Sequence, residues 1–337
     1  MERQGKSDGG SERPGEFELI ETLFAPLTAK AAGAYALKDD AALYSAQPGY
    51  ETVLTVDAMV EGVHFLSEDP PEDISRKLLR VNLSDLAAKG AVPKGYLLVA
   101  GWRRDTPLEW IKKFCAGLSR DQEVFDVSLW GGDTVVTPGP LTFSLTAVGE
   151  VPSGRMIHRS GARAGDAIYV TGTIGDSALG LMMLQGGLDI PDEGQAAHLA
   201  SRYRRPEPRT TFGPRLCGVA HAALDVSDGL MADLGHICEV SGTGARIELD
   251  LVPLSEAARA ALGRRPGLVE QIASGGDDYE ILFTIAPERA AAVAAIAREA
   301  GVPATRIGTI LERSEGVTAV DASGNRIPLK QLGYRHF

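Results

Sequence analysis

The stretch that ends at Gly90 has the clearest periodic pattern in the chain. Its apolar residues recur three and four positions apart, which is the spacing of one face of an α-helix. Glycine is common just after the last turn of a helix, so the pattern predicts an amphipathic helix that ends near Gly90. The apolar residues of this face are Leu79, Leu83, Leu86 and Ala87.

Polar residues occupy another face of the same predicted helix. Asn82, Asp85 and Lys89 lie three and four positions apart, so their side chains project from neighbouring turns. An amide and a carboxylate on one face suit a hard cation that is bound through oxygen atoms. The alternative is a solvated helix face with a lysine near its end, and this helix alone leaves both interpretations open.

The remaining patterns mix strands and helices without a strict alternation. This predicts an α+β fold rather than one doubly wound parallel sheet. The predicted strands are 41–44, 52–57, 95–102, 128–134, 141–151, 166–172, 222–226, 280–284 and 308–310. The predicted helices cover 16–32, 107–122 and 287–300 and begin near 175 and 228, and 202–208 is predicted to be a loop.

The chain is long enough for two domains by the usual relation between length and domain number. Residues 1–14 are polar and rich in glycine and charge, so we expect a disordered tail. Pro152–Gly154 reads as a link, so we expect an N-terminal domain over 15–151 and a C-terminal domain over 152–337.

The overall charge limits the classes of partner. A formal net charge of −11 disfavours nucleic acid, which requires a basic surface. An anionic substrate remains possible if divalent cations lie between it and the protein. The 3 cysteines form no CxxC pair, and the apolar runs are too short for a membrane span or a signal peptide. We therefore expect a cytoplasmic protein without a membrane partner.

Aspartates recur at strand ends, in glycine-containing turns and on the helix face described above. If several converge, two carboxylates about 4 Å apart repel by roughly 4 kcal/mol at an effective dielectric near 20. Several bound Mg²⁺ ions would relieve this repulsion, and Mg²⁺ with phosphate oxygens implies phosphoryl transfer. The alternative is that aspartate is simply common at turns and helix caps. The residues concerned are Asp39, Asp40, Asp57, Asp85, Asp133, Asp225, Asp228, Asp277 and Asp278.

Other site motifs are missing from the sequence. It contains no GxxxxGK[ST] phosphate loop, no HExxH zinc motif and no GxSxG nucleophile elbow. His64 follows a glycine at a predicted strand end, where it is either a structural or exposed residue or a substrate contact.

Ordered motifs along the chain resemble the thiamine-monophosphate kinase family, of the aminoimidazole ribonucleotide synthetase-like superfamily. The resemblance runs from Gly15 to the closing residues and leaves out only the tail. The motifs that carry it are 39–43 (DDAAL), 62–65 (GVHF), 81–88 (VNLSDLAA), 131–134 (GGDT), 159–162 (RSGA), 170–178 (VTGTIGDSA), 225–230 (DVSDGL) and 274–280 (SGGDDYE).

The resemblance implies ATP-dependent phosphorylation of thiamine monophosphate to thiamine diphosphate, the last step of thiamine diphosphate biosynthesis. It further implies direct in-line transfer, several Mg²⁺ ions and a homodimer that forms through the N-terminal domain. It implies metal ligands at Asp40, Thr55, Val56, Asp57, Asp85, Asp133, Asp225 and Asp228. It implies nucleotide contacts at Gly132, Asp133, Arg159 and Ser227, and substrate contacts at His64, Asp277 and Tyr334. The catalytic set would be Asp85, Asp133, Arg159 and Asp228.

Three positions depart from the family pattern. Val56 replaces a threonine and so removes a side-chain oxygen, which a backbone carbonyl or water could replace. Lys38 replaces a glycine, and Asp277 replaces a longer glutamate. We expect these changes to affect affinities rather than the reaction.

Two rival functions remain. One is an ATP-dependent enzyme of the same superfamily with another acceptor, such as selenophosphate synthetase or aminoimidazole ribonucleotide synthetase. The former usually has a reactive residue near its N-terminus, whereas no cysteine here precedes Cys115. The other is a non-catalytic scaffold, which has no reason to keep uncompensated carboxylates together.

Overall fold

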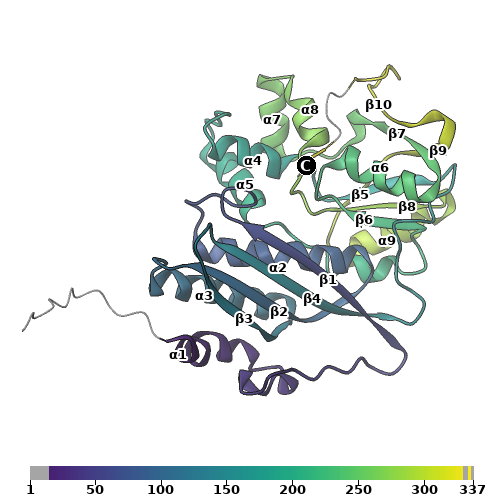
Figure 1. Cartoon of the computed structure of the whole chain (residues 1–337). Helices are drawn as coiled ribbons and strands as arrows, with labels where there is room; N and C mark the ends of the chain where they lie inside the picture. The colour runs from purple at the N-terminus through teal and green to yellow at the C-terminus, as the bar shows by residue number, and fades with distance from the viewer. Residues whose placement is uncertain (1–14, 329–332, 335–337) are drawn as a thin grey trace, which may run out of the picture.

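The chain is built around two β-sheets, one in each half of the sequence (Figure 1). The structure is a computed structural model and describes residues 15–328, 333 and 334. The predicted tail, residues 1–14, and the end of the closing motif lie outside this part of the chain. Within the described residues, every helix is too short or too polar to traverse a bilayer.

The first sheet has four strands in the order β1-β4-β2-β3. The β1–β4 and β4–β2 pairs are antiparallel, whereas β2 and β3 are parallel. Helices α2 and α3 cover one face. On this face Trp102 packs edge to face against Phe114 and Phe143, and Phe114 stacks on Phe143. The elements are β1 (Tyr50–Val60), α2 (Pro71–Ala88), β2 (Val92–Arg103), α3 (Leu108–Phe125), β3 (Ser128–Thr137) and β4 (Thr142–Pro152). The short helix α1 (Glu16–Leu19) and three further helical turns, 20–24, 25–28 and 32–37, precede them.

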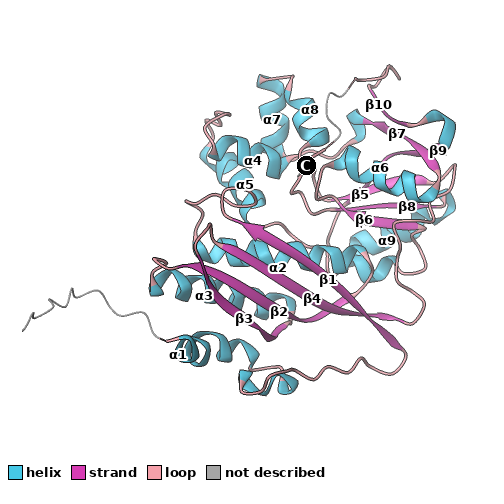
Figure 2. Cartoon of the chain, viewed as in Figure 1, coloured by secondary structure: helices cyan, strands magenta, loops and turns pink. Residues whose placement is uncertain are grey.

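The other face of the first sheet carries apolar side chains that the described residues leave exposed. In Figure 2 this face is turned toward the viewer, and α2 and α3 lie behind the strands. We call it the open face. Its large apolar residues are Leu54, Val56, Leu97, Val99 and Val135.

The second sheet has six strands in the order β10-β7-β9-β5-β8-β6 and is mostly antiparallel. Its strands are β5 (Ala167–Thr171), β6 (Ala222–Asp225), β7 (Thr243–Glu248), β8 (Ile281–Ile285), β9 (Ala304–Glu312) and β10 (Val317–Val320). Its helices are α4 (Asp176–Leu184), α5 (Glu193–Arg204), α6 (Leu230–Ser241), α7 (Glu256–Arg264), α8 (Leu268–Ser274) and α9 (Ala290–Ala300).

Helix α2 lies between the two halves and is buried along most of its length. It begins with Pro71, whose fixed φ suits the first helical position, and ends before Gly90, which has a φ of 75°. Its inner residues pack on the first sheet, while Ala87 and Ala88 join a core cluster with β8 of the second half. The alternative of a solvated polar face is therefore wrong, since even Asn82 is fully buried.

The α+β prediction is confirmed, because antiparallel pairs dominate both sheets. Three local predictions are wrong. Residues 41–44 form no strand, and Asp57 lies inside β1 rather than at its end. The predicted loop at 202–208 begins inside α5, because Arg202 is buried in an ion pair with Glu280 instead of being solvated. The domain boundary near 152 stays a prediction, although β4 ends there and the next strand belongs to the second sheet.

Candidate active site between the two halves

A cavity of about 1010 Å³ is lined by residues from both halves of the chain. The first half contributes β1, the turn that follows it and α2. The second half contributes the turn before α6, the start of α4, helix α8 and the loop before β8. Seven of the predicted site residues line this cavity: Val56, Asp57, His64, Ser227, Asp228, Asp277 and Tyr334.

Strand β1 and helix α2 bring two of the predicted metal ligands together. The hydroxyl of Thr55 donates to Asp85 Oδ2 at 2.5 Å, and the N–H of Asp57 donates to Asn82 Oδ1 at 3.0 Å. Burial, with a further contribution from the charge of Asp85, raises the pKa of Asp57 to about 6. The two carboxylates therefore interact as like charges.

Strand β6 adds a third carboxylate from the other half of the chain. Asp225 is the last residue of β6 and is 5% exposed. Its pKa is raised, first by burial and then by the negative charge of Asp85, with a smaller effect of Asp57. These interactions show that the three aspartates converge although they lie far apart in the sequence. They form what we call the acidic cluster: Asp57, Asp85 and Asp225.

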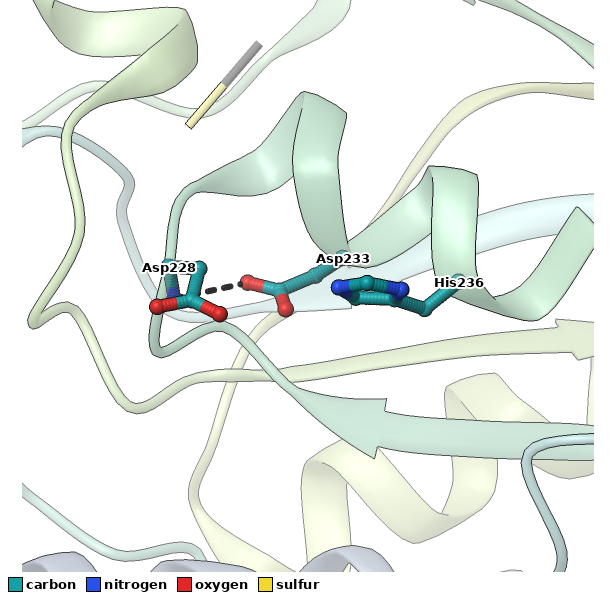
Figure 3. Close-up of side chains that lie close together, drawn as sticks. All are labelled: Asp228, Asp233 and His236. Carbon is teal, nitrogen blue, oxygen red and sulfur yellow. Dashed lines mark hydrogen bonds between the residues drawn. The ribbon is translucent and has the colours of Figure 1, made fainter. Parts of the chain in front are cut away.

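The turn between β6 and α6 presents Asp228 beside a second buried carboxylate. Asp233, in the first turn of α6, accepts hydrogen bonds from the backbone N–H groups of Ser227, Asp228 and Gly229 at 3.1, 3.0 and 3.1 Å. Figure 3 shows Asp228, Asp233 and His236 side by side, with one ligand atom of each within 4.8 Å of the others. Burial and the charge of Asp228 raise the pKa of Asp233 to about 7. The turn is thus fixed by a carboxylate that the sequence analysis did not identify.

Gly229 makes this turn possible. Its φ is 122°, a conformation that residues with a side chain rarely adopt, and a Cβ atom there would lie 2.5 Å from the carbonyl oxygen of Ser274. The close approach brings the loop before β8 against the turn, where Asp277 N–H donates to Ser227 O at 2.8 Å.

Comparison with known proteins identifies the family. Residues 38–151 match the N-terminal domain of AIR synthase related proteins, and residues 163–321 match the C-terminal domain. A thiamine-monophosphate kinase from Caulobacter vibrioides is 46% identical over 96% of this chain and 91% of its own length. The chain belongs to the thiamine-monophosphate kinase family.

Solved structures of thiamine-monophosphate kinases have the same fold. The enzyme from Stenotrophomonas maltophilia superposes with a TM-score of 0.80 at 38% identity, covering 91% of this chain and 98% of that one. AaThiL, complexed with AMPPCP and TMP, superposes with a TM-score of 0.76 at 31% identity, covering 96% and 97%. The resemblance stated from the motifs, including the kinase class, is confirmed.

Within a single copy of the chain, Asp133 lies apart from the acidic cluster. It belongs to β3, at the opposite edge of the first sheet from β1. It pairs with Val99, whose side chain is exposed on the open face, whereas Asp57 pairs with the buried Leu145. Successive residues of a strand point to opposite faces, so Asp133 and Asp57 project from different sides of the sheet. The metal and nucleotide roles of Asp133 stay predictions.

Other residues that the family resemblance points to lie at the edge of the site or outside it. Asp40 is exposed, and its N–H donates to the neighbouring Asp39 at 2.8 Å. Arg159 is exposed near Lys89, and its charge contributes to lowering the pKa of that half-buried lysine to about 8, after the larger effect of burial. Val56 offers only backbone oxygen, since its side chain is apolar and 59% exposed.

Two predicted residues have structural roles that the structure makes plain. Gly132 passes so close to β2 that a Cβ atom would lie 1.8 Å from the carbonyl oxygen of Leu98, at a φ of 153°. Asp278 is buried and accepts the N–H groups of Gly175 at 2.7 Å and Ser177 at 3.3 Å, which caps α4. Asp278 therefore lies in a glycine-containing turn because it caps a helix, whereas the adjacent Asp277 lines the cavity.

Proposed function

We propose that this protein transfers the γ-phosphoryl group of ATP to thiamine monophosphate and so forms thiamine diphosphate. The single observation that supports this most is similarity over nearly the whole chain to thiamine-monophosphate kinases, together with a cavity lined by both halves. AaThiL, which shares the fold, is complexed with AMPPCP and TMP, an ATP analogue and the proposed acceptor.

The acidic cluster fits magnesium. It offers only oxygen atoms, and Asp57 and Asp225 carry raised pKa values because like charges are buried together. We propose that Mg²⁺ ions are held by Asp57, Asp85, Asp225 and Asp228, with Thr55 beside Asp85. When bound, such ions would neutralise phosphate oxygens and carboxylates alike. The metal roles of Asp40, Val56 and Asp133 stay predictions, because Asp133 projects from the other face of the sheet and Asp40 is exposed.

The residues of the chain itself would bind and orient the two substrates. His64, Asp277 and Tyr334 line the cavity and would hold the acceptor, while Ser227 would contact the nucleotide. His64 is oriented by the N–H of Val60, which donates to its Nδ1 at 3.1 Å. We propose direct in-line transfer, because positioning supplies most of the catalysis in phosphoryl transfer and no phosphoenzyme is needed.

The test of this function is a product assay. Purified protein with ATP and Mg²⁺ is expected to convert thiamine monophosphate to thiamine diphosphate, as measured by chromatography of the thiamine compounds. A parallel reaction with free thiamine shows whether the phosphate is required in the acceptor. Folded protein that forms no thiamine diphosphate under these conditions would refute the proposed function and leave the scaffold alternative.

The open face supports a homodimer. Exposed apolar patches on soluble proteins usually mark an interaction surface, and the exposed apolar residues of the open face lie on β1, β2 and β3. We propose that a second copy of the chain covers it. The cysteines are all free thiols, which suits the reducing cytoplasm where we place the enzyme.

Charge on the open face is expected to separate the dimer. Leu97 on the inner strand β2 is 40% exposed, and Leu97→Glu would bury an unpaired carboxylate between the copies. Sedimentation velocity should report twice 35.6 kDa for the wild type and a single chain for the variant. Val124→Glu, at an equally apolar and 65% exposed site on α3, should leave the dimer intact. A wild type that sediments as a single chain would contradict the proposal.

A further inference from the structure

Lys77 is a buried cation at the boundary between the two halves of the cavity. It lies on α2, is 3% exposed and lines the cavity. Its Nζ donates to the carbonyl oxygen of His64 at 3.1 Å and to Asp277 Oδ2 at 2.8 Å. The same Nζ lies 4.0 Å from the centre of the Tyr203 ring. A buried lysine is costly unless it is paired, so these contacts explain how the charge is tolerated.

The two hydrogen-bond partners of Lys77 are both residues that we propose to contact the acceptor. His64 follows β1 in the first half, whereas Asp277 precedes β8 in the second half, 200 positions from Lys77. One ammonium group therefore ties the two walls of the acceptor site together. The position could have been found from the sequence, because Lys77, Val81 and Asp85 are spaced four apart and so share one face of the helix.

The loop that carries Asp277 needs such an anchor. Asp277 and Tyr279 both have positive φ values, of 71° and 52°, which are uncommon for residues other than glycine. The hydroxyl of Tyr279 donates to Asp277 Oδ1 at 3.2 Å, so Lys77 and Tyr279 hold opposite oxygens of one carboxylate. The orientation of Asp277 is therefore set by its neighbours before any ligand arrives.

The charge of Lys77 also matters for an anionic acceptor. Asp57, Asp228 and Asp277 all line the cavity, and a phosphate ester that enters it meets their negative charge. Of these three carboxylates, that of Asp277 forms an ion pair with Lys77. Without Lys77, the carboxylate of Asp277 would be left uncompensated beside the acceptor.

We propose that Lys77 is a positioning residue that sets the affinity for the phosphate-bearing acceptor, by fixing Asp277 against the His64 wall and cancelling its charge. This inference rests on the proposed function, because the acceptor is taken to be thiamine monophosphate. It assigns no role to Lys77 in binding ATP.

The decisive variant is Lys77→Met, which keeps an unbranched side chain one atom shorter than that of lysine and removes its charge. We expect the KM for thiamine monophosphate to rise about tenfold or more, and the KM for ATP to stay within about twofold of the wild type. The double variant Lys77→Met/Asp277→Asn removes both charges. Its KM for the acceptor should lie between those of the wild type and the single variant, because no bare carboxylate remains.

The matched control is Arg204→Met. Arg204 Nε pairs with Asp69 at 2.6 Å and also joins the two halves, but it does not line the cavity. Loss of this pair should lower the melting temperature without a selective change in the KM for the acceptor. If Lys77→Met raises both KM values alike, or no more than Arg204→Met does, the proposal is overturned.

The experiment distinguishes failure of the proposed function from failure of the role proposed for Lys77. A wild type that is folded but does not phosphorylate thiamine monophosphate refutes the proposed function, whatever Lys77 does. If Lys77→Met does not fold, the double variant, which has no unpaired buried charge, takes its place. An unchanged KM for the acceptor in the double variant would then overturn the role of Lys77.

Discussion

Asp85→Asn is expected to abolish turnover while the protein stays folded. Asp85 lies on α2 beside Thr55, and its charge acts on the pKa values of both Asp57 and Asp225. Asp85 is therefore the member of the acidic cluster whose charge acts on both of the others. Asparagine has nearly the same shape but removes the charge that a shared metal ion would need. Removal of one preorganised electrostatic group costs about 10²–10³-fold in kcat, and we expect at least the upper end here.

The same substitution should not lower stability in the absence of metal. Asp85→Asn removes like-charge repulsion with Asp57, so the melting temperature measured in chelator should not fall. Circular dichroism would verify the fold, and the rate of thiamine diphosphate formation would measure turnover. The control is Asp105→Asn, an exposed aspartate paired with Arg103 outside the cavity, which should retain wild-type activity. Near-normal turnover by Asp85→Asn would show that the acidic cluster is not the metal site.

Local signals predicted the central helix well. The apolar spacing before Gly90 and the Asp-Val-Ser-Asp-Gly turn each depend on residues within one or two turns of chain, so the sequence carries them directly. Helix α5 was missed because its polar residues, including Arg202, look like a solvated loop. Their burial depends on Glu280, which no local pattern connects with them.

The candidate site shows the same limit. Motifs predicted Asp57, Asp85 and Asp225, but not that Asp233 would hold the turn or that Lys77 would bridge the halves. Those two roles depend on contacts made only after the chain has folded. Adjacent residues can also differ in role: Asp277 lines the cavity, whereas Asp278 caps α4.

The sequence also did not show which face of the first sheet each aspartate points to. Asp57 and Asp133 each sit in a strand of the same sheet, and their motifs are equally clear in the sequence. Which face each one points to depends on pairing with the neighbouring strand, and a shift of one residue would reverse it. The open face on which Asp133 lies is also the proposed dimer interface, so its surroundings depend on a second copy of the chain.

Metal-free protein is expected to lose stability as the pH rises from about 4 to about 7, and Mg²⁺ is expected to restore it. The pKa of Asp57 is about 6 in the folded protein against 3.8 for the free group. The folded state therefore keeps a proton that the unfolded state has lost, and ionising Asp57 costs about 3 kcal/mol of the free energy of unfolding. Asp225 and Asp233, with raised pKa values, act in the same direction.

The change in melting temperature on adding Mg²⁺ should consequently be larger at pH 8 than at pH 5. His198 also has a raised pKa, because Asp176 accepts its hydrogen bond, and so it too loses stabilisation as the pH rises. His198 does not line the cavity, so subtracting the melting temperature in chelator from that in Mg²⁺ removes its contribution. Asp225→Asn should reduce the difference, since one buried charge is gone and one proposed ligand with it. A magnesium effect that is absent, or equal at both pH values, would mean that these carboxylates do not bind the ion, because binding must compete with protons for the same oxygens.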